Sequence, residues 1–353
     1  MKKRIVERKL SISKSIMESV GITYERLSSL LIELHSILGN KAIDLIPENI
    51  NDFSTLHFIV TLSENLSLLK NCEGFGQHIA RYTKKQIRSS HFVTELAAFL
   101  FSKVETLSLE PIYPNSKMSD ISVLFQGQSI YIECKGIETT KHDYSKEHDE
   151  FFSILKPIIT DIPHEISITY RKELSEDNVR ALGTVIRDRT ISISSNGRII
   201  DNPDVSVYVT RRDKSNNPSV KLYMSIIQEN LDERCRYPGN VYGVDGISLT
   251  ISGPKVSYKR VFKEKIRRSK SQAPLNSPYI LIIDGNLMLG CLSDNIRALA
   301  TAFQPKVNSR FSSAIIVEHN PRIGASQTDF KFQVVNNPFA KYPVTDHFLR
   351  LFK

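Results

Sequence analysis

The order of apolar and polar positions predicts a helical start to the chain. Apolar residues recur at helical spacing over Tyr24–Leu38, which ends at a Gly-Asn stop signal, and again over Ser54–Leu69. His91–Val104 has the same spacing, with Glu95 set inside an otherwise apolar stretch. Residues 1–90 are therefore expected to form a helical region that precedes a different kind of fold.

Residues 119–136, SDISVLFQGQSIYIECKG, contain two runs of strict alternation around a short polar turn. Gly at the first central position of a two-residue loop favours a type II′ turn at Gly127-Gln128. That register pairs Asp120 with Lys135 and puts Glu133 diagonal to Asp120 on the same face. The opposite face is apolar, so the sequence predicts a hairpin that packs on a core.

Two carboxylates at the end of a hairpin need a compensating charge, because like charges repel and Asp is depleted in strands. Diagonal strand neighbours lie about 7–8 Å apart, a gap that Asp120 and Glu133 would close around one Mg²⁺. The backbone carbonyl of Cys134 is a further candidate metal ligand. Lys135 projects to the same side, where it would orient or deprotonate the attacking water and offset charge on a phosphate.

Asp120, twelve intervening residues and then Glu133-Cys134-Lys135 resemble the signature of the PD-(D/E)XK nuclease superfamily. Ser119 replaces the Pro that often precedes the motif Asp. The resemblance implies a restriction-endonuclease-like fold, with a mixed β-sheet flanked by helices and a core order of helix, three strands, helix, strand. It also implies Mg²⁺, or Mn²⁺ in its place, and hydrolysis of DNA phosphodiester bonds by metal-activated water.

The surrounding elements can be assigned in that order. The first helix is His91–Val104, whose Glu95 the resemblance directs toward the metal as a further catalytic residue. The remaining core elements are a strand over Leu107–Tyr113, the hairpin, a helix over Tyr144–Ile159 and a strand over Glu165–Tyr170. The predicted α/β chain thus has a helical region at 1–90, a nuclease core with an extension at 91–213, and a C-terminal α/β region at 214–353.

Further elements are predicted beyond this core. Helices are expected over Ser175–Ile186, Lys255–Lys270 and Asn295–Phe303, and strands over Arg189–Ser194, Val205–Thr210, Val220–Ile227, Gly246–Ser252, Pro278–Ile283 and Ala314–Glu318. Asp284 ends an apolar strand without a partner carboxylate or a Gly-rich loop, and we interpret it as a turn residue.

The formal charge of +9 favours a polyanionic partner. Basic side chains gather in two segments. The first is a predicted helical stripe of Arg81, Lys84, Lys85 and Arg88; the second is the helix over Lys255–Lys270, with Lys259, Arg260, Lys263, Arg267 and Arg268. Phosphate binding and a merely solvated helix face remain alternatives for both segments.

The composition, 41% hydrophobic and 24% charged, is typical of a soluble globular protein, and no apolar run approaches a membrane span. No signal peptide is recognisable, so a cytoplasmic protein with no membrane association is expected. The four cysteines are far apart, which argues against a zinc site and a disulfide framework and favours reduced thiols.

Several alternatives stay open at this point. The same chemistry could act on RNA, or the chain could be a non-cleaving nucleic-acid-binding module or a scaffold subunit of a defence complex. A nuclease in restriction or phage defence is the preferred interpretation, either as a homodimer or with partner subunits.

Overall fold

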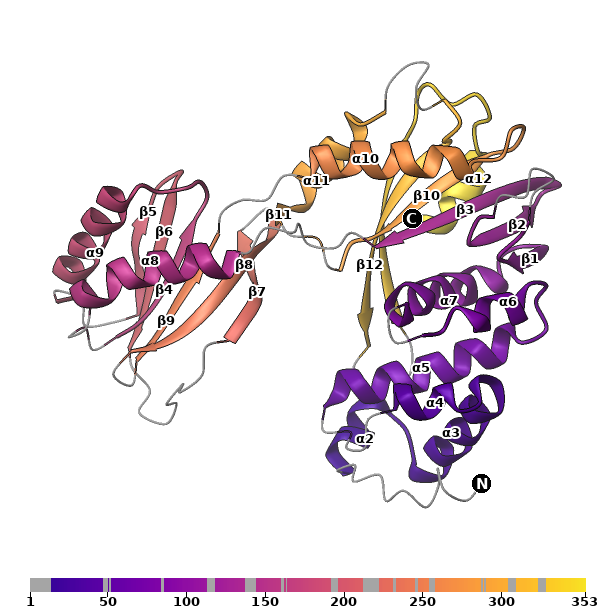
Figure 1. The fold of residues 1–353 in the computed structure, drawn as a ribbon, viewed down its shortest axis with the longest axis horizontal. Helices are drawn as coiled ribbons and strands as arrows, with labels where there is room; N and C mark the ends of the chain where they lie inside the picture. The colour runs from indigo at the N-terminus through magenta and orange to yellow at the C-terminus, as the bar shows by residue number, and fades with distance from the viewer. Residues whose placement is uncertain are drawn as a thin grey trace. The chain divides into compact units, whose positions relative to one another are not determined.

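The computed structural model describes residues 14–46, 50, 52–83, 86–112, 118–136, 144–159, 162, 164–191, 196–211, 222–230, 233–244, 247–253, 258–286, 288, 290–303, 309–322 and 328–353. The fold is mixed α/β, with two mixed sheets (Figure 1). The chain divides into two compact units. Unit 1 comprises Met1–Ile137, Lys259–Leu287 and Leu299–Lys353, and unit 2 comprises Glu138–Tyr258 and Met288–Ala298.

This division differs from the predicted boundaries at 90/91 and 213/214. The helical start of the chain belongs to the same unit as the hairpin, and residues on both sides of position 213 belong to one sheet. Unit 2 is inserted into the sequence of unit 1. The predicted boundaries divided the chain into consecutive segments, and such a division cannot reveal an insertion.

The N-terminal part of unit 1 is helical, as predicted. Its elements are α2 (Lys14–Val20), α3 (Tyr24–Leu38), α4 (Lys41–Leu45), α5 (Phe53–Leu69) and α6 (Phe75–Ala80). The side chains of Thr23 and Asp52 cap α3 and α5 by accepting backbone N–H groups of the first turn. The two helices bury Leu27, Leu34 and Leu62 in a shared apolar core.

A six-stranded sheet forms the centre of unit 1, in the order β1-β2-β3-β10-β12-β13. The strands are β1 (Thr106–Leu109), β2 (Ile121–Phe125), β3 (Gln128–Gly136), β10 (Tyr279–Asp284), β12 (Ser313–Pro321) and β13 (Thr328–Asn336). β3, β10 and β12 are parallel to one another, and the remaining neighbours are antiparallel.

Helices lie on both faces of this sheet. On one face, α7 (Ile87–Phe101) packs Phe92, Leu96 and Leu100 against strand residues such as Ile132 and Ile282. The other face is the side of α10 (Lys259–Ser269), as Figure 1 shows. A short helix η1 (Lys270–Gln272) follows α10, and the chain closes with α12 (Asp346–Leu349) and η2 (Arg350–Phe352).

The hairpin forms, but its turn lies one residue earlier than predicted. Gln126 and Gly127 have φ of 50° and 73°, which makes a type I′ turn, and Leu124 pairs with Ser129 and Ser122 with Tyr131. The side chain of Glu105 accepts the Gln126 N–H at 2.6 Å, which helps to hold this turn. The predicted faces are correct, because the slip changes the pairing by two positions and preserves the alternation.

The helix and strand assigned after the hairpin belong to the other sheet, and that part of the predicted core is wrong. The helix α8 (Tyr144–Ile159) and the strand β4 (His164–Tyr170) form as expected, but both lie in unit 2. The strand that joins β3 is β10, which follows α10 in the sequence and runs parallel to β3.

Unit 2 is built on a seven-stranded sheet whose main path runs β11-β8-β9-β4-β6-β5, with β7 paired to β8. Its further elements are α9 (Glu176–Ile191), β5 (Gly197–Asp201), β6 (Val205–Arg211), β7 (Leu222–Asn230), β8 (Glu233–Val244), β9 (Ile247–Ser252), β11 (Gly290–Cys291) and α11 (Leu292–Ala300), whose last two residues fall in unit 1. The strand predicted over Arg189–Ser194 is wrong, because α9 continues to Ile191. The strands β5, β8, β11 and β13 were not predicted.

The cysteines correct one expectation. Cys72 and Cys134 are free, as predicted, whereas Cys291 is disulfide-bonded. In the antiparallel β8–β11 pair, the backbone register partner of Cys291 is Cys235. Within the described part of the chain, no helix combines the length and apolar character that crossing a bilayer requires.

Candidate functional site

The end of the hairpin brings together Asp120, Glu133 and Lys135. Ile121 pairs with Ile132, and the Asp120 N–H donates to the Ile132 carbonyl at 3.2 Å, so Asp120 stands across from Glu133 instead of diagonal to it. Asp120 is 6% exposed and Glu133 is 1% exposed. The Lys135 ammonium forms an ion pair with Glu133. The structure therefore places the predicted triad together, in a closer pairing than the sequence indicated.

Burial dominates the electrostatics of Glu133. Its pKa is raised, first by burial and then by the Asp120 carboxylate, while Lys135 and the nearby Tyr279 hydroxyl act in the opposite direction. Burial also acts to lower the pKa of Lys135, but Glu133 outweighs burial and the pKa of Lys135 is raised. Lys135 is therefore a cation at neutral pH and is suited to stabilise negative charge more than to accept a proton.

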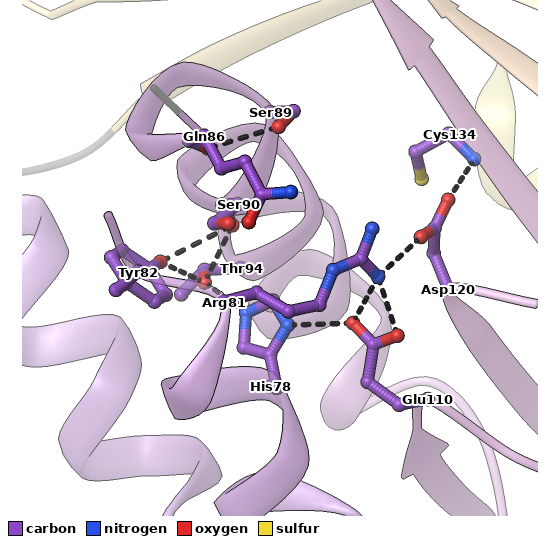
Figure 2. A network of polar contacts seen from close by, with 10 residues as sticks. All are labelled: His78, Arg81, Tyr82, Gln86, Ser89, Ser90, Thr94, Glu110, Asp120 and Cys134. Atoms are coloured by element: carbon purple, nitrogen blue, oxygen red, sulfur yellow. Dashed lines mark hydrogen bonds and ion pairs between the residues drawn. The ribbon is translucent and has the colours of Figure 1, made fainter. Parts of the chain in front are cut away.

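Asp120 is held from two sides, as Figure 2 shows. The Cys134 N–H donates to Asp120 Oδ2 at 2.8 Å, and Arg81 Nη1 lies 3.1 Å from Asp120 Oδ1. Each carboxylate of the pair thus has its own cation, Arg81 for Asp120 and Lys135 for Glu133. The role of the Cys134 carbonyl as a metal ligand stays a prediction.

Arg81 belongs to a polar network that the sequence did not reveal. Arg81 Nη1 donates to Glu110 Oε1 at 2.6 Å, and His78 Nδ1 lies 3.1 Å from the same oxygen. His78 Nε2 lies 2.9 Å from Thr94 Oγ1 on α7, and Tyr82 contacts that hydroxyl (Figure 2). Burial acts to raise the pKa of Glu110, but His78 and Arg81 lower it, so Glu110 stays ionised.

The placement of Arg81 corrects the predicted basic stripe. α6 ends at Ala80 and α7 begins at Ile87, so Arg81 and Arg88 do not share one helical face. Lys41 Nζ caps the break by binding the carbonyls of Ile79 and Ala80 at 3.1 and 3.2 Å. Lys84 and Lys85 lie outside the described residues, and Arg88 is exposed on α7.

The contacts of Glu95 in the described residues are with His91, His319 and Thr328, and its role at the metal site stays a prediction. Glu95 lies on the α7 face of the sheet, where Oε2 is 2.9 Å from His319 Nδ1 and Oε1 accepts from Thr328 at 3.0 Å. Glu133 alternates with Ile132 and Cys134, whose side chains pack toward α7, so it projects to the opposite face. The helical spacing correctly indicated a buried carboxylate but not which face it serves.

Asp284 joins the same buried cluster. His319 Nε2 lies 3.4 Å from Asp284 Oδ1, and that oxygen also accepts the Asn286 N–H at 2.9 Å. The turn predicted at Asp284 is therefore present. His91 Nε2 lies 3.5 Å from Glu95 and completes the cluster.

The predicted basic helix is confirmed as α10, and its charges face outward. Phe262 and Ile266 are buried, whereas Lys259, Arg260, Lys263, Arg267 and Arg268 are exposed. Lys265 Nζ donates to the Gly136 carbonyl at 3.1 Å, which ties α10 to the end of β3 next to Lys135. Arg268 is paired with Glu264. Whether this surface binds nucleic acid stays a prediction.

The residues at the hairpin end fit a hard divalent cation. Glu133 Oε2 is buried and, within the described residues, has no hydrogen-bond partner of regular geometry. Among the same residues no group of three or more His, Cys, Asp or Glu side chains is arranged to hold a metal ion. Mg²⁺ needs only one or two carboxylates, since waters and substrate phosphates complete its coordination. Asp120 and Glu133 would be the two that hold it.

In comparisons with known proteins, no family model, no curated protein and no solved structure matches this chain.

Proposed function

We propose that this protein is a Mg²⁺-dependent nuclease that hydrolyses phosphodiester bonds of DNA. The observation that carries the proposal is the buried carboxylate pair: Asp120 stands across from Glu133, and burial together with the Asp120 carboxylate raises the pKa of Glu133. Two buried carboxylates that repel each other are costly unless a cation joins them. The ion pairs with Arg81 and Lys135 offset that repulsion only in part.

The order of elements in unit 1 supports a restriction-endonuclease-like core. α7, β1, β2, β3, α10 and β10 give helix, three strands, helix, strand in one mixed sheet, with unit 2 inserted between β3 and α10. This is the order that the resemblance implies. Its last helix and strand are α10 and β10, whereas the sequence indicated α8 and β4.

Each residue has a distinct role in the proposed reaction. Asp120 and Glu133 would hold Mg²⁺, which when bound polarises a phosphate oxygen and makes a nearby water more acidic. Lys135, a cation next to Glu133, stabilises the negative charge that develops on the phosphate during hydrolysis. The exposed basic face of α10 supplies phosphate contacts that hold the nucleic acid.

A cleavage assay tests the proposal. The purified full chain is incubated with plasmid, linear duplex, single-stranded DNA and RNA, each with Mg²⁺, Mn²⁺ or EDTA. We expect metal-dependent cleavage of DNA that Asp120→Asn and Glu133→Gln abolish. Asp188→Asn, which makes the same chemical change at an exposed position of α9, is the matched control.

The alternatives give different results in that assay. Cleavage of RNA alone would assign the same chemistry to another substrate. Metal-independent binding without cleavage of any substrate would support the non-cleaving binding or scaffold subunit. Cleavage that survives in both Asp120→Asn and Glu133→Gln would place the activity elsewhere, and the proposed site would be wrong.

A further inference from the structure

Arg81 is fixed next to the carboxylate pair by unusual local backbone. Gly74 is the N-cap residue of α6 and has a φ of 76°, and a Cβ there would lie 1.7 Å from the Leu109 carbonyl oxygen. The Leu109 N–H donates to the Glu73 carbonyl at 2.8 Å. α6 therefore lies directly against the end of β1, and Arg81 at its C-terminal end is brought beside Glu110.

Glu110 itself has a strained backbone. Its φ is 49°, which a residue with a Cβ rarely adopts, and its N–H donates to the Asp120 carbonyl at 2.9 Å. Such strain persists only where the surroundings impose it, and it is concentrated at functional sites. Here it turns the Glu110 carboxylate inward, where it is 3% exposed and binds both His78 and Arg81.

The guanidinium of Arg81 is only partly used by these contacts. Nη1 makes the contacts to Glu110 and to Asp120, and the side chain is 42% exposed. Within the described residues, no hydrogen bond is made by Nε or Nη2. A guanidinium has five N–H donors in a planar fork that suits phosphate, so donors remain for a ligand that approaches beside Asp120.

We propose that Arg81 binds a non-bridging oxygen of the nucleic-acid phosphate that enters next to Asp120, and that Glu110 and His78 hold its guanidinium in place for that contact. The inference rests on the proposed nuclease function and adds a substrate-binding residue to it. Arg81 and Lys135 stand on either side of the carboxylate pair and flank the bound phosphate with positive charge. Glu110 is a positioning residue that acts through Arg81.

A purely structural ion pair is the competing explanation. A structural ion pair requires only the contacts that Nη1 makes. It would be just as stable if the guanidinium were shielded from solvent. The exposed half of Arg81 and its unused donors favour a ligand. Binding and rate measurements separate the two explanations, since a structural pair affects folding and not the contact with phosphate.

The test compares Arg81→Gln with Arg26→Gln, an exposed Arg of α3 that pairs with Glu64 at 3.3 Å and thus loses the same charge and the same kind of partner. Binding of a fluorescent DNA duplex is measured in EDTA across a range of salt concentrations. Arg81→Gln should make the salt slope shallower by about one unit, the value for one lost phosphate contact. Arg26→Gln should leave the slope unchanged.

Single-turnover cleavage at saturating duplex gives the second readout. Arg81→Gln should slow it about tenfold or more, because the phosphate is no longer oriented. Millimolar guanidinium should restore part of the rate of Arg81→Ala, because it can occupy the same position beside Asp120. Glu110→Gln should lower the rate, and combining it with Arg81→Gln should add little, because both act through one contact. Thermal melting checks that each variant is folded.

The outcomes distinguish this inference from the proposed function. If the wild-type protein cleaves DNA and Arg81→Gln keeps the wild-type salt slope and rate, Arg81 is structural and the inference is wrong. If no substrate is cleaved but Arg81→Gln still reduces the salt slope, the phosphate contact stands and the nuclease proposal fails. An unchanged slope in a protein that binds without cleaving overturns both.

Discussion

His319 lies between two carboxylates of different elements, with Nδ1 at 2.9 Å from Glu95 Oε2 and Nε2 at 3.4 Å from Asp284 Oδ1. Burial acts to lower the pKa of His319, but Asp284 and Glu95 outweigh it and raise the pKa to about 9. Burial acts to raise the pKa of Glu95, yet His91 and His319 hold it below its ordinary value. The contacts join α7, β10 and β12 through a partly buried imidazolium.

The first prediction is a pH dependence of stability that His319 controls. A raised folded-state pKa stabilises the protein fully below the unfolded value of about 6.5. That contribution is lost as the pH rises through about 9. Glu95, with a lowered pKa, loses its contribution as the pH falls below about 4. The free energy of unfolding of the wild-type protein, measured in urea, should therefore decrease as the pH rises through about 9. In His319→Gln this decrease should be smaller.

His347→Gln, at an exposed position of α12, is the control and should leave the alkaline decline as in wild type. An identical decline in His319→Gln would show that another group titrates.

Glu95→Gln should lower stability near neutral pH without changing the Mg²⁺ concentration that activity requires. A raised Mg²⁺ requirement would return Glu95 to the metal site.

A second prediction concerns Gly74. Gly74→Ala would force a Cβ to within 1.7 Å of the Leu109 carbonyl oxygen at a φ of 76°. We expect destabilisation of at least about 2 kcal/mol in chemical denaturation. Gly76→Ala, two residues further along α6 with nothing within 4 Å of the added Cβ, should be neutral or stabilising by about 0.5–1 kcal/mol. Equal stability of the two variants would contradict the close approach of α6 to β1.

The hairpin illustrates what alternation along a sequence can predict. Period two determines which side chains share a face, so Asp120, Glu133 and Lys135 were grouped correctly. The turn was predicted wrongly. The preference of Gly for the first central position of a type II′ turn indicated Gly127-Gln128, whereas in the structure the two central residues are Gln126 and Gly127, both with positive φ. The side chain that helps to hold Gln126, Glu105, is distant in sequence, and local preference contains no information about it.

The network around Arg81 shows why part of the site could not be predicted. Glu110 follows an apolar strand and looked like its continuation, whereas a positive φ ends the strand there. Arg81, His78 and Thr94 meet only because α6 packs on β1 and α7. Likewise, helix and strand patterns identified α8 and β4 correctly, but the choice between β4 and β10 as the neighbour of β3 is a long-range pairing that periodicity does not encode.

A third prediction concerns α10. Lys263→Gln combined with Arg267→Gln removes two exposed charges that flank the buried Ile266 and Phe262. If α10 grips phosphates, the salt slope for duplex binding should become shallower by about two units. Lys146→Gln with Arg187→Gln, which removes two exposed charges of unit 2, is the matched control. If the two double variants show the same salt dependence of duplex binding, the charged side chains of α10 face solvent and do not contact phosphate.

The last prediction separates the roles of the triad. Asp120→Asn and Glu133→Gln should lose both cleavage and Mg²⁺ binding in calorimetric titration. Both variants should keep the fold, because the amide oxygen introduced by Asp120→Asn can still accept from the Cys134 N–H and repulsion between the carboxylates falls. Lys135→Ala should behave differently. It should keep Mg²⁺ binding and duplex affinity and slow cleavage by a factor on the order of 10² or more, because a cation beside the reacting phosphate is lost. Cleavage by Lys135→Ala at the wild-type rate, or unchanged Mg²⁺ binding by Asp120→Asn, would show that the carboxylate pair is not the catalytic centre.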